Sequence, residues 1–191
     1  MSELNQKILR SMDFFLSFSG LMLFSPLLLP VLCFDRIGSR TLLFKQKRVG
    51  RNQKPFILIK FRTMLPGTPS VASHLSSASA VTSVGKILRR TKLDELPQLW
   101  NVFKGEMSLV GPRPCLTNQN ELIRKRETLG VYDVLPGITG LAQIQGIDMS
   151  NPQLLAEVDA KMLTSLNLKN YFRYIFLTLM GKGLGDKINL N

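Results

Sequence analysis

Two adjacent carboxylates, Asp94 and Glu95, are the residues of this sequence best placed to do chemistry. They belong to the stretch "TKLDELPQLWNVFKGEMSLVGPRP" at residues 91–114, which follows a pair of arginines and ends with Arg113 between two prolines. A guanidinium fixed in a stiff turn can make bidentate contacts to phosphate oxygens. The stretch therefore fits a site at which a carboxylate meets a phosphate group, and it also fits a capped helix followed by a stiff turn.

A helix is predicted directly after the two acids. Its apolar residues are spaced i, i+3, i+4 and i+7, at Leu96, Leu99, Trp100 and Phe103. Gly105 is a typical residue to end such a helix, and Asp94 stands where its N-cap is expected. The positive end of the helix also favours an anion there. A structural cap and a reactive carboxylate both fit this position, so both interpretations stay open at this point.

A strand with two cations is predicted upstream, in "PFILIKFRTM" at residues 55–64. Alternation assigns one face to the apolar residues Ile57, Ile59 and Phe61 and the other face to Lys60 and Arg62. A solvated strand face would account for the two cations by itself, whereas a phosphate site would use them. Residues 66–83, rich in Ser, Pro and Gly, are predicted to form a mobile loop.

The strongest global signal is an apolar run at residues 12–34, in which Asp13 is the only charged residue. About 23 residues at 1.5 Å each are long enough to cross a bilayer core. A secretory signal peptide is not expected, because the sequence has no alanine before Ala72 and no small-residue cleavage site follows the run. A core helix of a soluble protein remains as the plain alternative.

A re-entrant course is predicted for this run. Pro26 and Pro30 each remove a helical hydrogen bond, so a bend is expected at Ser25-Pro26. Basic residues flank both ends, at Lys7, Arg10, Arg36, Arg40, Lys45, Lys47 and Arg48. Because basic flanks favour the cytoplasm, a bent helix that enters and leaves the same leaflet satisfies both ends, whereas a straight spanning helix does not.

Composition narrows the classes of partner and site. The net charge of +12 over 191 residues points to an anionic partner, which includes nucleic acid, lipid headgroups and phosphorylated metabolites. His74 is the only histidine and lies in a serine-rich stretch, which argues against a His-based triad and most His-ligated metal sites. Cys33 and Cys115 have neither disulfide nor zinc spacing.

A second membrane contact is predicted at residues 168–181. An apolar stripe with adjacent polar and cationic residues is formed by Tyr171, Phe172, Ile175, Phe176 and Leu179, beside Lys169, Asn170 and Arg173. Such an aromatic amphipathic helix can lie in the membrane interface, and a helix packed on the core fits the same pattern equally well.

Several motifs in order carry a resemblance to a known family. "RSMDF", the Ser25-Pro26 pair, "KFRTM", "LDELPQLWNVFKGEMSLVGPRP" and "PGITGLAQ" together resemble the bacterial sugar transferases, the monotopic phosphoglycosyl transferases, over nearly the whole chain. The resemblance implies an α+β fold that is mostly helical with a small β element. It implies an N-terminal segment at 1–40 with a re-entrant membrane helix, and a catalytic domain at 41–191 with interfacial helices.

The resemblance also implies an activity. The family moves a sugar phosphate from a UDP-sugar to polyprenyl (undecaprenyl) phosphate, requires Mg²⁺ and releases UMP, which begins the assembly of a cell-surface glycan. Asp94 would be the nucleophile, forming a covalent phosphosugar-aspartyl intermediate, and Glu95 would hold Mg²⁺ with it or assist the acceptor. The residues expected to contact phosphate are Lys60, Arg62, Arg89 and Arg113, and a further acid that matches the family is Asp159.

The location and partners follow from the same resemblance. The catalytic domain is expected on the cytoplasmic face of the bacterial inner membrane, in contact with membrane lipids. Nucleic acid is not an expected partner, and the resemblance does not decide whether the protein forms a homodimer. Two departures from the family concern "GID" at 146–148, where many members have "GRN", and Leu141, where many have tryptophan. They leave the sugar undetermined. The expected form is the minimal one, without a multi-span N-terminal extension.

Two other functions remain in competition. A membrane-attached basic module that binds nucleic acid or anionic lipid would explain the charge and the apolar run, but it leaves the acid pair unused. A UDP-sugar hydrolase would use the same acids, with water in place of the lipid phosphate as the acceptor.

Overall fold

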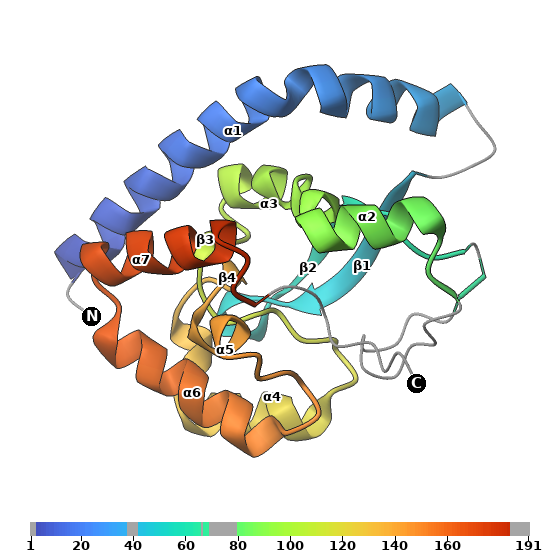
Figure 1. Cartoon of the computed structure of the whole chain (residues 1–191). Helices are drawn as coiled ribbons and strands as arrows, with labels where there is room; N and C mark the ends of the chain where they lie inside the picture. The colour runs from blue at the N-terminus through green and yellow to red at the C-terminus, as the bar shows by residue number, and fades with distance from the viewer. Residues whose placement is uncertain (1–2, 38–41, 66, 69–79, 184–191) are drawn as a thin grey trace.

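The computed structural model describes residues 3–37, 42–65, 67–68 and 80–183 of the chain (Figure 1). These residues are mostly helical, as expected. The elements in chain order are α1 Glu3–Ile37, β1 Leu43–Val49, η1 Arg51–Gln53, β2 Pro55–Phe61, α2 Ser83–Thr91, η4 Leu93–Glu95, α3 Gln98–Lys104, β3 Ser108–Val110, α4 Asn120–Thr128, η5 Val131–Asp133, β4 Gly137–Thr139, α5 Leu141–Ile144, α6 Pro152–Ser165 and α7 Leu168–Leu179.

Two small sheets make up the β structure. Strands β1 and β2 form an antiparallel pair whose register runs from Leu43 opposite Phe61 to Val49 opposite Pro55. Strands β3 and β4 form a parallel pair in which Ser108 lies opposite Gly137. Helices surround both pairs, with α1 above them and α4 and α6 below in the view of Figure 1. The expected mostly helical fold with a small β element is confirmed.

Helix α1 is longer than the predicted run at 12–34, since it extends from Glu3 to Ile37. Its part from Glu3 to Pro26 is long and apolar enough to cross a membrane. The helix continues through the expected break, where Pro26 cannot donate to the Met22 carbonyl. The Ser25 hydroxyl donates to that carbonyl instead, over 2.8 Å. The Ser25-Pro26 pair therefore alters the hydrogen bonding within a helix that arches over the domain in Figure 1. A re-entrant course stays a prediction.

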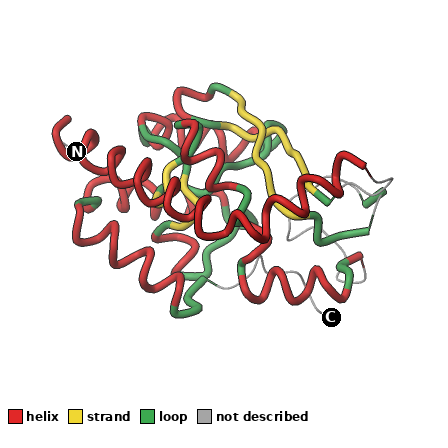
Figure 2. The backbone as a smooth tube through the Cα atoms, turned by 90° about the horizontal axis from the view of Figure 1, so that it is seen from above, coloured by secondary structure: helices red, strands yellow, loops and turns green. Residues whose placement is uncertain are grey.

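Helix α1 is attached to the end of α3 by one arginine and by aromatic stacking. Arg10 donates to the carbonyls of Val102 and Phe103, over 2.8 and 3.1 Å. These belong to the last turn of α3, whose carbonyls lack partners within the helix. The Phe14 ring stacks on Phe103 with 5.0 Å between centroids. Figure 2, seen from above, shows α1 running across the domain.

A buried polar cluster fixes α1 to two further elements. Asp13, the only charged residue of the apolar run, is 2% exposed. Its Oδ1 accepts hydrogen bonds from Ser108 Oγ, the Leu109 amide and Tyr171 Oη, over 3.0, 2.8 and 2.8 Å. The aspartate thus faces the domain and ties α1 to β3 and α7.

The prediction that Ile57, Ile59 and Phe61 form the buried face of β2 is partly wrong. Ile57 is 47% exposed, whereas Leu58 is 6% exposed and packs with Val102 and Met107. The reason is that α3 covers the face of Phe56 and Leu58, and alternation places Lys60 on that same face. The cation therefore lies at one end of a packed face, and not on a separate solvated one.

The segment before α2 was expected to be a loop at 66–83. Residues 66 and 69–79 lie outside the described residues, and the final residue, Ser83, already belongs to α2. Thr82 is the N-cap of this helix, because its hydroxyl accepts from the Gly85 amide over 2.9 Å.

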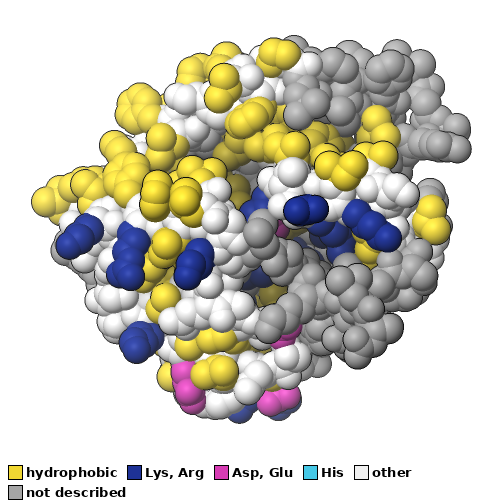
Figure 3. All heavy atoms as spheres, in the orientation of Figure 1, with side chains coloured by type: hydrophobic (Ala, Val, Ile, Leu, Met, Phe, Trp, Pro, Cys, Tyr) yellow, Lys and Arg dark blue, Asp and Glu magenta, His cyan; other side chains and the backbone are white. Residues whose placement is uncertain are grey.

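Helix α7 has one side packed on the core and an apolar side that is exposed, so its predicted contact with the membrane interface stays a prediction. Tyr171 and Tyr174 are buried in the core. Phe176 and Leu179 are 60% and 80% exposed. Figure 3 shows exposed apolar side chains gathered on the upper part of the molecule, along α1 and α7, with cations below them. The exposed large apolar residues of these elements include Phe14, Phe15, Phe18, Met22, Leu23, Phe172, Phe176 and Leu179.

Candidate active site

The two acids lie in a tight 3-10 turn between α2 and α3. Lys92 begins the turn in the left-handed conformation, with φ of 57°. The Glu95 amide donates to the Lys92 carbonyl over 3.1 Å, as a 3-10 turn requires. The α-helix begins only at Gln98, with Pro97 as its N-cap residue. The prediction that Asp94 is an N-cap is therefore wrong, because a separate 3-10 turn precedes the helix.

Asp94 is nearly enclosed, with 7% of its surface exposed. Within the part of the chain that the structure describes, its carboxylate accepts no hydrogen bond, although Lys60, Arg89 and Arg113 act on it electrostatically. These three cations come from β2, α2 and the segment after β3. A buried carboxylate that faces cations without a capping bond has the form of a reactive group.

The surroundings change the basicity of Asp94. Burial, followed by the charge of Glu95, raises the pKa of Asp94 from 3.8 to about 6, while the three cations oppose the rise. The carboxylate is thus mostly ionised at neutral pH and more basic than an ordinary aspartate. Both properties suit attack on an electrophilic phosphorus.

Arg113 and Glu95 form an ion pair beside Asp94. The distance from Arg113 Nη1 to Glu95 Oε1 is 3.2 Å, and the two side chains are 29% and 15% exposed. The predicted association of this arginine with the acid pair is therefore present in the structure. A guanidinium at this position, beside the buried Asp94, is suited to contact the phosphate oxygens of a substrate.

Arg89 is held by a residue that the sequence analysis did not single out. Its Nε donates to Thr63 Oγ1 over 2.8 Å. Its Nη1 is buried and has no hydrogen-bond partner among the described residues. Thr63 follows β2 in the "KFRTM" motif, and its carbonyl accepts from the Thr82 amide over 3.0 Å. Only the tertiary arrangement of β2 and α2 reveals this contact.

The cations of β2 lie at the end of the strand nearest to the turn. Lys60 Nζ lies 5.5 Å from the centre of the Phe44 ring, and Arg62 Cζ lies 5.6 Å from it. Lys60 is one of the cations that act on Asp94. Arg62 is one residue beyond β2 and shares the aromatic contact with Lys60, so the structure places it next to this group of cations.

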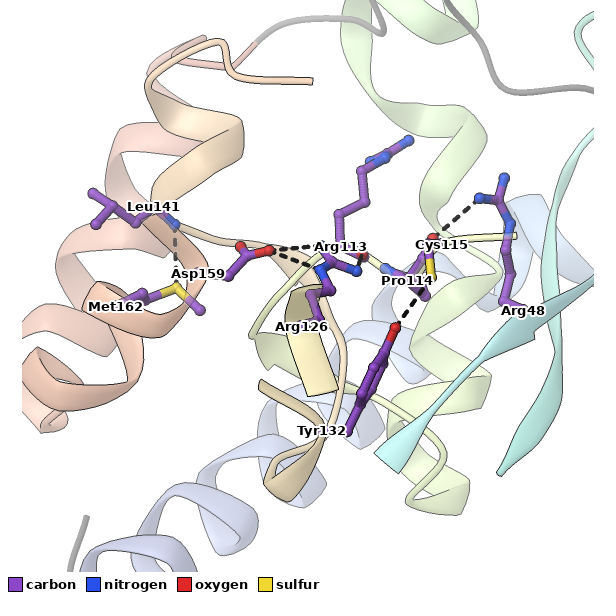
Figure 4. A network of polar contacts seen from close by, with 9 residues as sticks. All are labelled: Arg48, Arg113, Pro114, Cys115, Arg126, Tyr132, Leu141, Asp159 and Met162. Carbon is purple, nitrogen blue, oxygen red and sulfur yellow. Dashed lines mark hydrogen bonds and ion pairs between the residues drawn. The ribbon is translucent and has the colours of Figure 1, made fainter. Parts of the chain in front are cut away.

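Asp159, the further acid indicated by the resemblance to the family, occupies a different place. It is 1% exposed, and its Oδ2 accepts from Arg126 Nε and Nη2 over 3.0 and 2.6 Å. Arg126 Nη1 in turn donates to the Arg113 carbonyl over 2.8 Å. Figure 4 shows Arg126 between Asp159 and the Arg113 backbone. Asp159 therefore reaches the site through Arg126 and does not face the acid pair.

The acid pair is also the group best suited to hold a metal ion. Mg²⁺ typically takes one or two protein carboxylates together with substrate phosphates and water. Among the described residues, no group of three or more His, Cys, Asp or Glu side chains converges. Asp94 and Glu95 thus fit the sparse donor set of Mg²⁺, and they do not fit a closed all-protein cage.

Comparison with known proteins adds independent findings. The family model described as bacterial sugar transferase matches residues 4–182. The chain is 34% identical over 98% of its length to the UDP-glucose:undecaprenyl-phosphate glucose-1-phosphate transferase of Escherichia coli, covering 42% of that protein. It is 40% identical over 72% of its length to the protein of the same name in Caulobacter vibrioides, covering 56% of it.

Other relatives differ in the sugar that their names state. The chain is 36% identical over 72% of its length to a UDP-N-acetylgalactosamine-undecaprenyl-phosphate N-acetylgalactosaminephosphotransferase of Aeromonas hydrophila, covering 34% of it. The chain thus spans about half, or less, of the length of these relatives. The resemblance drawn from the motifs is confirmed, and the chain belongs to the bacterial sugar transferase family.

Proposed function

We propose that this protein transfers a sugar-1-phosphate from a UDP-sugar to polyprenyl phosphate and releases UMP. The observation that carries the proposal is Asp94, a buried carboxylate of raised pKa that faces three cations. The names of the family members support the substrate classes, although the chain spans only part of their length. The same site is superfluous in a basic module that only binds nucleic acid or lipid.

Two displacements at one phosphorus make up the reaction. An Asp94 carboxylate oxygen attacks the phosphorus that bears the sugar, and the bond from this phosphorus to the UMP oxygen breaks. UMP leaves with the bonding electrons, and a sugar phosphate remains on Asp94 as a mixed anhydride. An oxygen of polyprenyl phosphate then attacks the same phosphorus. The anhydride bond breaks, which restores the Asp94 carboxylate and yields a polyprenyl diphosphate sugar.

The surrounding cations solve the electrostatic problem of this chemistry. A carboxylate that approaches a diphosphate meets repulsion between anions, so positive groups must neutralise the phosphoryl oxygens. Lys60, Arg89 and Arg113 come from three separate elements and lie around Asp94, which suits this role. Mg²⁺, when held by Asp94 and Glu95, would supply further neutralisation of the phosphates.

Membrane attachment fits an acceptor that is a lipid. The exposed apolar side chains of α1 continue onto α3 at Trp100, which is 47% exposed and stacks on Phe103 with 5.7 Å between centroids. An aromatic surface of this kind suits the membrane interface. With basic flanks at both ends of α1, a re-entrant helix would keep the catalytic domain on the cytoplasmic face of the inner membrane.

One assay separates the competing functions. Purified protein is incubated with Mg²⁺ and each of a panel of UDP-sugars, with and without polyprenyl phosphate, and UMP is measured over time. The proposed function predicts turnover only with acceptor for one or more sugars, and loss of UMP release on chelation of divalent cations. Sustained turnover without acceptor would identify a hydrolase. No UMP with any sugar would leave the binding module as the better account.

A further inference from the structure

Two buried arginines donate hydrogen bonds to the backbone carbonyls of Arg113 and of the residue that follows it. Arg126 of α4 donates from Nη1 to the Arg113 carbonyl over 2.8 Å, and Arg48 of β1 donates from Nη1 to the Pro114 carbonyl over 3.0 Å. Both arginines are more than nine-tenths buried. Figure 4 shows the two side chains reaching this segment from opposite sides.

Arg126 is itself oriented by Asp159. Three nitrogens of its guanidinium have partners: Nε and Nη2 bind Asp159 Oδ2, while Nη1 binds the Arg113 carbonyl. Because the guanidinium is planar and rigid, the ion pair with Asp159 sets the direction in which Nη1 points. Asp159 is also the counter-charge that a buried arginine requires.

The hydrogen bond to the Arg113 carbonyl helps to fix the position of the Arg113 backbone. The prolines on either side restrict the backbone of the "GPRP" segment. The side chain of the same residue then reaches Glu95, with Nη1 3.2 Å from Oε1. A shift of the Arg113 backbone therefore moves its guanidinium relative to the acid pair.

We infer that Arg126 and Asp159 form a positioning pair that sets the orientation of Arg113 toward the phosphates of the UDP-sugar. The hydrogen bonds of the pair among the described residues go to each other and to the Arg113 carbonyl, so the pair acts through this carbonyl. This inference rests on the proposed function. It assigns Asp159 a role in the reaction that needs no contact with substrate or metal.

If the ion pair between Arg126 and Asp159 had only a structural role, an apolar replacement that keeps the protein folded would leave kcat/KM unchanged. Buried ion pairs can often be exchanged for apolar residues of similar volume without loss of stability. Such an exchange keeps α4 packed on α6 but removes the donor to the Arg113 carbonyl. Stability and catalysis are therefore separable in one variant.

The test is the double variant Arg126→Met with Asp159→Leu, measured as UMP release at varied UDP-sugar in the presence of acceptor. We expect a folded, membrane-bound protein of near wild-type thermal stability with kcat/KM reduced by roughly 100-fold, the scale of an error of about 1 Å in positioning. A matched control is Leu155→Val on α6, a buried residue of the apolar core whose side chain has no group that could bond the Arg113 carbonyl. It should lower the thermal stability and leave kcat/KM within about twofold.

A double-mutant cycle decides whether the effect passes through Arg113. Arg113→Lys should reduce kcat/KM strongly in the wild-type background and by less than about threefold in the background without the pair. Equal factors in the two backgrounds, or wild-type kcat/KM in the folded double variant, would overturn the inference.

A second variant keeps the test decisive if the double variant fails to fold. Arg126→Lys retains the charge beside Asp159, but its single ammonium lacks the fork that binds both acceptors. The same loss and the same non-additivity with Arg113→Lys are expected. Failure of the proposed function itself would look different, because the wild-type protein would then release no UMP from any UDP-sugar.

Discussion

The Arg113 guanidinium lies 3.2 Å from the Glu95 carboxylate, measured from Nη1 to Oε1, and so stands beside the buried Asp94. One short stretch of chain supplies both the anionic and a cationic part of the site, since α3 and β3 turn the chain back on itself between them. Arg113 is therefore placed to contact a phosphoryl group while Asp94 reacts with it.

Arg113→Lys should reduce kcat/KM for the UDP-sugar by about two orders of magnitude, because lysine keeps the charge and loses the bidentate fork. The protein should stay folded and membrane-bound, which thermal unfolding and membrane fractionation would show. A matched control is Arg124→Lys on α4, whose side chain is exposed. Near-normal activity of the Arg113 variant would mean that this arginine only braces the turn.

The raised pKa of Asp94 predicts how the first step depends on pH. A protonated carboxyl is a poor nucleophile, so UMP release in a single turnover should fall as the pH is lowered through about 6, the pKa of Asp94. Rapid-quench measurements between pH 5 and 8 would show it. A rate that stays constant down to about pH 5 would contradict this assignment.

The same pKa predicts a stability effect of known sign. The pKa of Asp94 is about 6 in the folded protein, above its ordinary 3.8, so the folded state binds more protons than the unfolded state between these values. The contribution of Asp94 to stability is therefore present at low pH and lost as the pH rises through about 6. At pH 8 the ionised side chain costs about 3 kcal/mol. The free energy of unfolding of the Asp94→Asn variant, relative to that of the wild type, should therefore increase as the pH rises from 4 to 8. A constant difference between the two proteins over this range would contradict the raised pKa.

Tyr171→Phe should loosen the attachment of α1. The change removes the phenol that donates to Asp13 over 2.8 Å and leaves a buried carboxylate oxygen with one partner fewer. A hydrogen bond to a charged group is worth about 1.5–3 kcal/mol, so the free energy of unfolding in detergent should fall by about this amount. The comparison variant is Phe172→Leu, at a neighbouring exposed position. Equal effects of the two changes would show that the polar cluster contributes nothing special.

The topology prediction uses single cysteines in a background where Cys33 and Cys115 are replaced. One cysteine takes the place of Leu4 in α1 and another the place of Thr128 in α4, both exposed residues. A re-entrant helix predicts that neither is labelled by an impermeant reagent in intact cells and that both are labelled after lysis. Labelling of position 4 alone in intact cells would establish a spanning helix. Pro26→Ala should then shift some molecules toward that spanning state, because residue 26 regains its hydrogen bond to Met22.

Local patterns in the sequence predicted much of the site. Asp94, Glu95 and Arg113, which lie together in the structure, were identified from their spacing within one stretch. Lys60 was named as a phosphate contact only with the resemblance to the family, because the alternation of β2 assigned it to the wrong face. Glycine and apolar periodicity also predicted the end of α3 at Gly105, which adopts φ of 84°. Residues close in sequence carry this kind of information because the turn and helix that position them are local structures.

The parts that sequence reasoning missed depend on tertiary packing. Thr63 orients Arg89, and Arg126 pairs with Asp159 across 33 residues, only because α2 lies against the segment that follows β2 and α4 lies against α6. The faces of β2 were misassigned because the position of α3 decides which side of a short strand is buried. The assignment of Asp94 as the N-cap was wrong because a 3-10 turn at Leu93–Glu95 precedes the α-helix, which begins at Gln98. Residue propensities do not distinguish the start of such a turn from the start of an α-helix a few residues later.

The most direct measurement is the mass of the protein after incubation with UDP-sugar and Mg²⁺ without acceptor. Covalent catalysis by Asp94 predicts release of UMP and a gain of one sugar phosphate on the peptide that holds Asp94. A chase with polyprenyl phosphate should remove this added mass. Asp94→Asn should neither gain this mass nor support transfer. An Asn variant that keeps substantial transfer, or a wild-type protein that transfers sugar phosphate and never gains mass, would contradict covalent catalysis by Asp94.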